Sequence, residues 1–458
     1  MKYQYGFTHM LLFLILEFFY ISFDYLNHYI VLIIFLSYII NVFIFNRNFM
    51  LRYIYIIFYI GSNIIGIFLI ETDYFYLSEL RTYSFNNNSF LMIILAHVFF
   101  IETLRFLDSK KKESNFIKKS IIQYKNFRIE KSQFLQILIW IFLILFLFMF
   151  SRVIDTPFFE VKLDRFLYKD QYLGIWDKIS NSILYFSGLI GLYYFHTKDK
   201  KVLIFLFMIF TYLFWIGHKF SIFLSLGYII FLPFIWYVSK KVVNKIIIAS
   251  IGGILLLIII VSLQSFIVYE RNYSENNEYI KMRLAQQGQL WWATYGVEKG
   301  KENNLQEISE EFNTFFRIKT DKNDLYNSGI YKIMKLTTPY DVFVQKVNLK
   351  NSRYAYSTQA TIYYYFKGLG LILFSIISGI IYFFVINKLI KNIQLYRIIP
   401  TILYTRLLLI CNNVLLQSDF NKFFSLEVIL IITILAVHSI ITKNLTKKHV
   451  RTSNISKN

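Results

Sequence analysis

The segment 278–300 carries the residue types of this sequence that best suit a sugar–phosphate ligand. If it forms one helix, Arg283 and Gln287 lie one turn apart on the same side. Trp291 and Tyr295 continue that side over the following turns. An arginine binds phosphate oxygens through parallel hydrogen bonds, an amide matches sugar hydroxyls, and aromatic rings cover the apolar faces of sugars. The pattern therefore predicts a face that could bind a sugar phosphate.

The same segment has a plainer interpretation as an amphipathic helix that lies on the outer leaflet of a membrane. Trp291 and Trp292 would then anchor the helix at the interface, where indole rings are enriched. Gly288 fits either interpretation, because a residue without a Cβ lets another backbone or a ligand approach closely. The residues alone leave both interpretations open.

Cations outside this segment could also bind an anionic ligand. Lys219 stands in the sequence Gly-His-Lys-Phe-Ser, at the junction of two apolar runs. A cation there costs free energy unless it is hydrated, paired or bound to an anion, and a tight turn with a snorkelling lysine is the alternative. Arg353 lies in the long hydrophilic segment, and Arg152 lies close to Asp155 at a predicted membrane edge. This last pair is either a salt bridge or part of a binding site.

Charged residues within the apolar runs need a partner, because lipid offers them none. Arg406 either binds a lipid diphosphate or pairs with an internal carboxylate such as Glu17. Glu102 and Arg105, three positions apart, predict a structural ion pair on one helix. Two isolated histidines are expected to be hydrogen-bonded inside the bundle: His97 and His438.

These residues need a scaffold that lies in a membrane. Of the 458 residues, 56% are hydrophobic and 20% aromatic, so a soluble domain of this composition would expose large apolar patches. The apolar runs do not alternate as barrel strands do, and a spanning backbone must satisfy its own hydrogen bonds, so helices are expected. Runs long enough to cross the hydrocarbon core lie near 6–23, 29–45, 51–70, 89–106, 134–151, 180–196, 202–217, 220–238, 246–268, 363–386, 397–416 and 425–442. No small-residue cleavage site follows the first run, which is expected to be an uncleaved span.

Lysines and arginines are distributed unevenly over the connections between these runs. With the N-terminus inside, the cytoplasmic connections hold 24 of them and the short outer connections hold 8. Because positive residues are retained on the cytoplasmic side, this bias predicts an even number of spans with both termini cytoplasmic. The same pattern accounts for the net charge of +21, which no nucleic-acid-reading motif accompanies.

The one long hydrophilic segment, 269–362, is then extracytoplasmic. It holds 13 Lys/Arg and 11 Asp/Glu together with periodic apolar positions, so it is expected to fold against the bundle. The predicted fold is all-α, a polytopic transmembrane bundle of about 12 spans with one large extracytoplasmic loop between spans 9 and 10. Its parts are 1–268 with spans 1–9, 269–362 as the loop, 363–442 with spans 10–12, and 443–458 as a basic cytoplasmic tail.

The pattern Arg-x-x-x-Gln-Gly-x-x-Trp, at Arg283, Gln287, Gly288 and Trp291, resembles a motif of Wzy-type O-antigen and capsular polysaccharide polymerases. As in that family, it begins a large outer loop late in the bundle. The resemblance implies transfer of a growing glycan from undecaprenyl diphosphate to the next lipid-linked repeat unit, at the bacterial cytoplasmic membrane. It also implies a reaction without metal, nucleotide or other cofactor, in a pathway that contains a flippase and a chain-length regulator.

In such a reaction, cations must stabilise the charge that develops on the diphosphate leaving group. Arg283 is the first candidate, Gln287 shares its face, and Lys219 is a supporting cation. The candidate substrate-binding residues are Trp291, Trp292, Tyr295, Arg353, Arg406 and Arg152. The acceptor hydroxyl could need a general base, for which three carboxylates are equal candidates: Glu278, Glu298 and Asp341.

Other functional classes compete with a polymerase. A flippase for the same lipid-linked units would share the spans and the cations, but transporters usually consist of two related halves, whereas one long loop interrupts this chain late. A purely structural membrane protein would not need the aromatic and cationic segment. An O-antigen ligase and a metal-dependent dolichol-type glycosyltransferase are disfavoured, because all seven histidines lie outside 269–362 and the first outer loops contain no Asp-x-Asp. The single cysteine, Cys411, excludes an internal disulfide, and neither a phosphate-binding P-loop nor a zinc-ligand spacing occurs.

Overall fold

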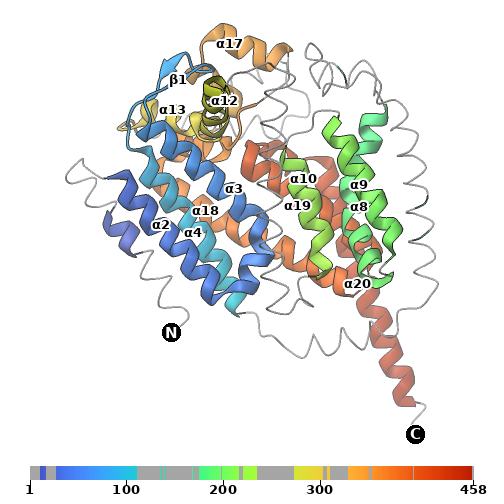
Figure 1. Ribbon diagram of the computed structural model, residues 1–458. Helices are drawn as coiled ribbons and strands as arrows, with labels where there is room; N and C mark the ends of the chain where they lie inside the picture. Colours follow the sequence, from blue (N-terminus) through green and yellow to red (C-terminus); the bar gives the residue numbers. More distant parts are fainter. Residues whose placement is uncertain are drawn as a thin grey trace.

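The computed structural model describes residues 11–16, 27–110, 136, 140, 168, 175–197, 199–215, 220–234, 273–302, 307–309, 329–349, 353–395 and 397–455. Figure 1 shows a bundle of helices with shorter elements covering one of its ends. The helices of the bundle are α2 (His28–Phe45), α3 (Arg47–Thr72), α4 (Ser89–Lys110), α8 (Ile175–Thr197), α9 (Lys200–Trp215), α10 (Phe220–Phe231) with the 3₁₀ turn η2 (Leu232–Phe234), α18 (Ser357–Gln394), α19 (Ile398–Gln417) and α20 (Leu426–Ile455).

Five of these helices, α2, α3, α4, α18 and α19, are long and apolar enough to cross a membrane. Shorter apolar stretches occupy Leu184–Phe195, Ile222–Phe231 and Leu426–Ile440. The outward faces of α2, α18 and α20 expose large aliphatic side chains, among them Ile33 and Leu369. Such faces are stable in lipid rather than in water. The chain is therefore a helical membrane protein. The predicted span 246–268 and most of the predicted spans 6–23 and 134–151 lie outside the described residues.

Side-chain contacts show that neighbouring helices run in opposite directions. His28 at the start of α2 is bonded to Glu71 near the end of α3, with 2.5 Å between Nε2 and Oε2. Arg52 near the start of α3 forms an ion pair with Asp108 near the end of α4, with 2.5 Å between Nη1 and Oδ1. These helices therefore connect at alternate ends of the bundle, as the predicted topology requires.

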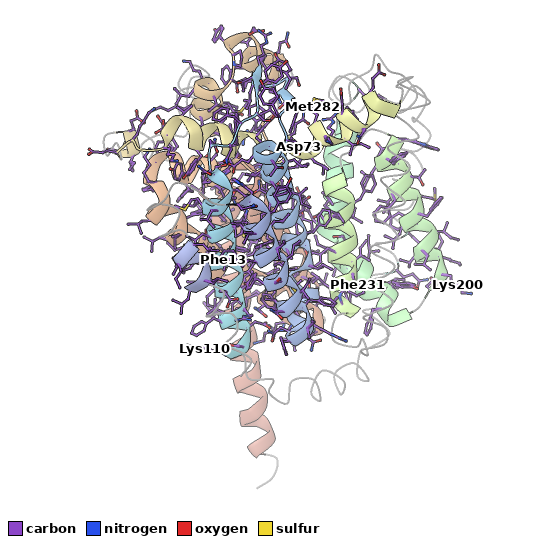
Figure 2. All side chains as sticks on the ribbon, turned by 60° about the vertical axis from the view of Figure 1, so that its left-hand side comes forward. Phe13, Asp73, Lys110, Lys200, Phe231 and Met282 are labelled. Atoms are coloured by element: carbon purple, nitrogen blue, oxygen red, sulfur yellow. The ribbon has the colours of Figure 1, made fainter. Side chains whose placement is uncertain are left out.

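The two ends of the bundle carry different segments. Asp73 and Met282 lie at one end, and Lys110 lies at the other (Figure 2). The first end carries the connection 72–88 and the segment 273–302, which belongs to the long hydrophilic stretch. Lys110, which was predicted to be cytoplasmic, lies at the opposite end.

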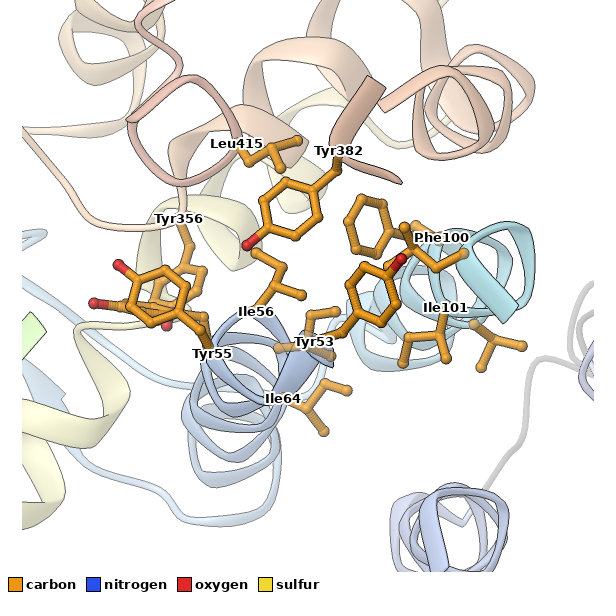
Figure 3. Close-up of a cluster of buried hydrophobic side chains, with 14 of the residues drawn as sticks. Tyr53, Tyr55, Ile56, Ile64, Phe100, Ile101, Tyr356, Tyr382 and Leu415 are labelled. Atoms are coloured by element: carbon orange, nitrogen blue, oxygen red, sulfur yellow. The ribbon is translucent and has the colours of Figure 1, made fainter. Parts of the chain in front are cut away.

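The centre of the bundle is an aromatic and aliphatic core. Helix α18 runs through it and packs against α4 on one side and α19 on the other. Figure 3 shows Tyr53 of α3, Phe100 of α4 and Tyr382 of α18 meeting there. The ring centroid of Tyr382 lies 6.5 Å from that of Tyr53 and 6.0 Å from that of Phe100, and both distances are within the range of favourable aromatic pairs. A second core joins α8, α9 and α10 and includes Tyr212.

Helix α18 is longer than the predicted span 363–386 and contains a break. It begins at Ser357, and Lys367 has a φ of 53° and a ψ of −158°, which interrupts the helical geometry. A positive φ is costly for a residue with a Cβ. The Nζ of Lys367 contacts a carboxylate oxygen of Glu298 at 2.8 Å, which ties this break to the segment that covers the end of the bundle.

We call the described residues that cover this end the cap: 72–88, 273–302, 307–309, 329–349 and 353–356. Its elements are the hairpin of β1 (Tyr76–Leu77) and β2 (Thr82–Tyr83), α12 (Tyr273–Ala285), α13 (Gln289–Glu298), α16 (Gly329–Thr337), α17 (Tyr340–Val344) and the π turn η3 (Gln345–Leu349). Leu80, Leu290, Trp292 and Met334 share a buried core within the cap. The cap therefore folds against the bundle, as its apolar positions predicted.

Candidate functional site

The segment 278–300 is two helices rather than the single helix that the sequence predicted. Helix α12 ends at Ala285, a turn follows, and α13 begins at Gln289. The turn is closed by hydrogen bonds from the amide of Gln287 to the carbonyl of Leu284 and from Gly288 to Ala285. The expected continuous face is therefore wrong, because a turn separates Arg283 from Trp291.

Close backbone contact with α3 explains this turn. A Cβ added to Gly66 would lie 2.6 Å from the carbonyl oxygen of Leu284, and one added to Gly288 would lie 2.7 Å from the amide nitrogen of Ile67. The side chain of Asn63 donates to the carbonyl of Gln287 at 2.7 Å. Of the two roles considered for Gly288, the approach of another backbone is therefore confirmed.

The two tryptophans point into the protein. Trp291 is 1% exposed and Trp292 is 3% exposed. The indole Nε1 of Trp291 donates to the carbonyl of Ser89 at 3.1 Å, and that of Trp292 donates to Phe85 at 2.9 Å. Neither ring is an interfacial anchor, which corrects that expectation. Trp291 fixes α13 to the first residue of α4, and Trp292 fixes it to the connection between α3 and α4. Tyr295, also predicted to bind substrate, is buried against these rings.

Arg283 remains at the surface of the cap. Its Nε donates to the hydroxyl of Tyr279 at 2.9 Å, and its Nη1 donates to Oε1 of Gln286 at 3.1 Å. Its guanidinium carbon lies 5.1 Å from the centre of the Tyr279 ring. No carboxylate among the described residues forms an ion pair with it, and Nη2 keeps donors for an anion. Gln287, whose amide bonds to the carbonyl of Arg283 at 3.2 Å, is partly exposed beside it.

A carboxylate that the sequence did not single out gathers several polar side chains of the cap. Glu79, in the turn of the hairpin, accepts from Lys346 at 2.6 Å and from Gln286 at 3.3 Å, and it also accepts from Gln289. The Nζ of Lys346 lies 4.3 Å from the ring centre of Tyr354. Glu79 therefore links the hairpin, both ends of the turn between α12 and α13, and η3. Only the fold brings these positions together, because 207 residues separate Glu79 from Gln286.

Arg353 belongs to a separate ionic cluster in the cap. Its Nη1 lies 3.1 Å from Asp419, in the turn between α19 and α20, and its Nε donates to the hydroxyl of Tyr331 at 2.9 Å. Lys422 contacts the second oxygen of Asp419 at 2.7 Å. Burial alone would raise the pKa of Asp419, but Arg353 and Lys422 outweigh it and hold this pKa below its usual value. Burial likewise opposes the positive charge of Arg353, but Asp419 and Tyr331 raise its pKa.

Arg406 has a carboxylate partner in the neighbouring helix. Its Nε and Nη2 contact the two carboxylate oxygens of Glu427 at 2.5 and 2.8 Å. Its guanidinium carbon lies 4.4 Å from the ring centre of Tyr185, whose hydroxyl it also contacts. The carboxylate partner is Glu427. Glu17, named as a candidate partner, lies outside the described residues. This bidentate pair satisfies the guanidinium without a ligand.

Other structural predictions for charged residues are confirmed. Arg105 and Glu102 form an ion pair at 2.8 Å, and the carboxylate of Glu102 also accepts from Tyr38 at 2.7 Å. His97 is buried, with its Nε2 3.0 Å from Oδ1 of Asn63, the residue that holds the turn before α13. These side chains tie helices together.

Several predicted site residues lie outside the described residues: Lys219, Arg152 and its neighbour Asp155. Of the candidate bases, Glu298 is buried and paired with Lys301 and Lys367, at 3.1 and 2.8 Å. Asp341 is paired with Arg81. Glu278 is exposed on α12. No group of three or more His, Cys, Asp or Glu side chains in the described part of the chain is placed to hold a metal ion.

A family of unknown function (DUF6418) matches residues 323–432. This stretch runs from α16 and the ionic cluster of Arg353 through the hairpin of α18 and α19 to the start of α20. It does not include the segment of Arg283. No curated protein and no solved structure matches the chain significantly.

Proposed function

We propose that this protein polymerises undecaprenyl-diphosphate-linked oligosaccharide repeat units into O-antigen or capsular polysaccharide. The reaction takes place at the outer face of the bacterial cytoplasmic membrane, on a bundle of about 12 spans with both termini in the cytoplasm. One observation supports the proposal above the others: Arg283 of the polymerase-like pattern is exposed, oriented by neighbours and without an ion-pair partner among the described residues.

Transfer of a glycan from a lipid diphosphate requires a fixed cation near the leaving group. When the glycan leaves its lipid carrier, negative charge develops on the diphosphate oxygen, and a fixed guanidinium lowers the free energy of that charge. Tyr279 and Gln286 each accept from one nitrogen of Arg283 and restrict its orientation, and the side chain is exposed. A preoriented cation stabilises a developing charge better than a flexible one, because it need not reorganise during the reaction.

The other residues of the motif support this role of Arg283 because they fix the position of α12. The carbonyl of Gln287 is held by Asn63, Gly288 lies against the backbone of α3, and Trp291 is bonded to Ser89. These contacts attach the end of α12 to helices that cross the membrane. A guanidinium at a fixed height above the membrane suits a substrate whose diphosphate is carried at the end of a lipid chain.

The test is a glycan ladder from cells that lack the gene, resolved on a gel. We expect single repeat units to survive on the cell surface while all longer chains are lost. Loss of every repeat unit, with lipid-linked units trapped on the cytoplasmic leaflet, would show instead that the protein is the flippase. A ladder of normal length would exclude both functions.

The role of Arg283 is tested in the same cells with Arg283→Ala, and its matched control is Lys281→Ala. Both cations lie on α12, but Lys281 forms a surface ion pair with Asp73 at 3.1 Å, which contributes little. We expect Arg283→Ala to leave only single repeats, at normal protein level, and Lys281→Ala to keep the full ladder. A full ladder from Arg283→Ala would remove this residue from the mechanism.

A further inference from the structure

A buried carboxylate at the cap end of the bundle is bound by three donors. The side chain of Glu71, near the end of α3, is 0% exposed. Its Oε1 accepts from both the amide and the hydroxyl of Ser89, each at 2.6 Å. Its Oε2 lies 2.5 Å from Nε2 of His28. Burial of a carboxylate costs several kcal/mol unless it is paired in this way, so the three groups form one unit.

Glu71 orients the ring of His28. Its carboxylate accepts from Ser89 on one oxygen, and the neutral tautomer of His28 with its proton on Nε2 donates to the other oxygen. In that tautomer the second ring nitrogen, Nδ1, can accept a proton. A carboxylate that fixes the tautomer of a histidine also stabilises the cation formed when the other nitrogen takes up a proton.

The imidazole of His28 is held in place by its neighbours but is not fully buried. Its ring stacks on Phe90, with 5.7 Å between centroids and an interplanar angle of 27°. The side chain of His28 is 11% exposed, whereas that of Glu71 is fully buried. His97, by comparison, is buried within the bundle and its Nε2 is bonded to Asn63. His28 thus combines a fixed orientation with a side chain that is not fully buried.

The dyad of His28 and Glu71 is joined directly to the polymerase-like segment. The amide and hydroxyl of Ser89 bind Glu71, and its carbonyl accepts the indole proton of Trp291 at 3.1 Å. The amide of Asn87, two residues earlier, donates to the carbonyl of Trp292 at 2.8 Å. Asn87 in the connection between α3 and α4 and Ser89 at the start of α4 therefore position α13, and Ser89 also holds the carboxylate that orients the imidazole.

Two of the three carboxylates considered as general bases are paired with cations. Glu298 lies between Lys367 and Lys301, and Asp341 is paired with Arg81, whereas Glu278 is exposed on α12. The imidazole of His28 is bonded instead to a carboxylate, that of Glu71, at 2.5 Å.

We propose that His28, oriented by Glu71, accepts the proton of the sugar hydroxyl that attacks the lipid-linked glycan, an inference that rests on the proposed function. The hydroxyl oxygen forms a bond to the anomeric carbon as the bond from that carbon to the diphosphate oxygen breaks. The electron pair of the broken bond leaves with the lipid diphosphate. The hydroxyl proton passes to Nδ1 of His28, and the resulting imidazolium is stabilised by Glu71.

The variant that separates catalysis from structure is His28→Gln. The glutamine amide can still donate to Glu71 and link α2 to α3, but it has no basic nitrogen. The full-length protein is purified, placed in vesicles and supplied with lipid-linked repeat units extracted from cells that lack the gene. Turnover is measured per folded molecule, with the folded fraction taken from the monodisperse peak in detergent. His438→Gln, in α20, is the control for a histidine replacement.

We expect His28→Gln to reduce turnover by about 100-fold or more, with little change in KM, while His438→Gln keeps wild-type turnover. Glu71→Gln should lower turnover as well, because the amide cannot stabilise the imidazolium. Wild-type turnover per folded molecule in His28→Gln would overturn the proposal, including the case in which the variant folds poorly. So would a rise in KM without a loss of turnover.

The two proposals fail in different ways. If cells without the gene keep long chains or lose every repeat unit, the proposed function is wrong whatever His28 does. If the wild-type gene restores the ladder in those cells and His28→Gln restores it equally, the polymerase remains and only the role of the dyad is lost.

Discussion

Replacement of Gly66 by alanine is a direct test of how the cap is attached to the bundle. Gly66 lies in α3, and a Cβ there would be 2.6 Å from the carbonyl oxygen of Leu284 and 3.1 Å from the amide nitrogen of Gly288. Both are backbone atoms, so no side-chain rotation relieves the clash. The chain offers a matched control in Gly61, which lies in the same helix and where an added Cβ would have nothing within 4 Å.

The expected difference between the two variants follows from three contributions. Each replacement gains about 1 kcal/mol, because alanine is the better helix former. Gly66→Ala then loses about 3 kcal/mol, at the upper end of the cost of overpacking, since backbone must move. Moving the turn also breaks the hydrogen bond from Asn63 to Gln287, which contributes about 1 kcal/mol. Gly66→Ala should therefore be less stable than Gly61→Ala by about 4 kcal/mol.

The assay is the unfolding midpoint of the purified protein in detergent micelles, followed by tryptophan fluorescence, which reports on buried Trp291 and Trp292. We expect Gly61→Ala to unfold at or above the wild-type midpoint and Gly66→Ala well below it. Equal midpoints would refute the close contact between α3 and the turn. An equal loss in both variants would place the cost within α3 itself and would also refute the reasoning.

Two further predictions concern ion pairs. In the folded protein, Arg353 and Lys422 lower the pKa of Asp419 despite its burial. The charged Asp419 therefore stabilises the fold at pH values above its ordinary pKa of 3.8. This stabilisation is lost as the pH falls through the lower pKa of the folded state. Asp419→Asn should lower stability by about 1 kcal/mol at pH 7 and weaken the loss of stability in acid, as measured by unfolding midpoints from pH 7 to pH 3. Arg406→Met should destabilise the protein by about 2 kcal/mol, because Glu427 is left without its cation at a membrane helix, and adding Glu427→Met should recover most of this loss. If the role of Arg406 is only to pair with Glu427, cells with the double variant keep a full glycan ladder. If Arg406 binds the ligand, the double variant gives a shortened ladder.

The membrane bundle could be predicted from the sequence because its signals are local. Apolar runs mark the helices α2, α3, α4 and α19, and charge bias predicts the alternation of their ends. Pairs on one helix, such as Glu102 with Arg105, follow from spacing alone. The break at Lys367 does not, because the contact of this lysine with Glu298 depends on how the cap lies against α18.

The candidate site was less predictable because its contacts join distant parts of the chain. The pattern that includes Gln287 and Gly288 fits a continuous helix, and only the fit of Gly288 against Gly66 shows why the chain turns there. The role of Ser89 as a shared partner of Glu71 and Trp291 has no counterpart in spacing, since 202 residues separate Ser89 from Trp291. Tryptophans at a membrane edge suggested interfacial anchors, whereas their indole groups donate to carbonyls at the start of α4 and in the connection that precedes it.

The contacts divide the polymerase-like pattern into one exposed group and several fixed ones. Gln287 through its carbonyl, Gly288 through its missing Cβ and Trp291 through its indole all hold the end of α12 and the start of α13 against α3 and α4. Arg283, one turn before them, is thereby carried to a defined place at the surface. Since a misplacement of about 1 Å can cost a reaction about 100-fold, replacements of the fixed residues should impair a polymerase without removing a group that touches its substrate. Loss of Arg283 itself should leave the fold intact and remove the charge, so the two kinds of variant differ in stability even where their glycan ladders look alike.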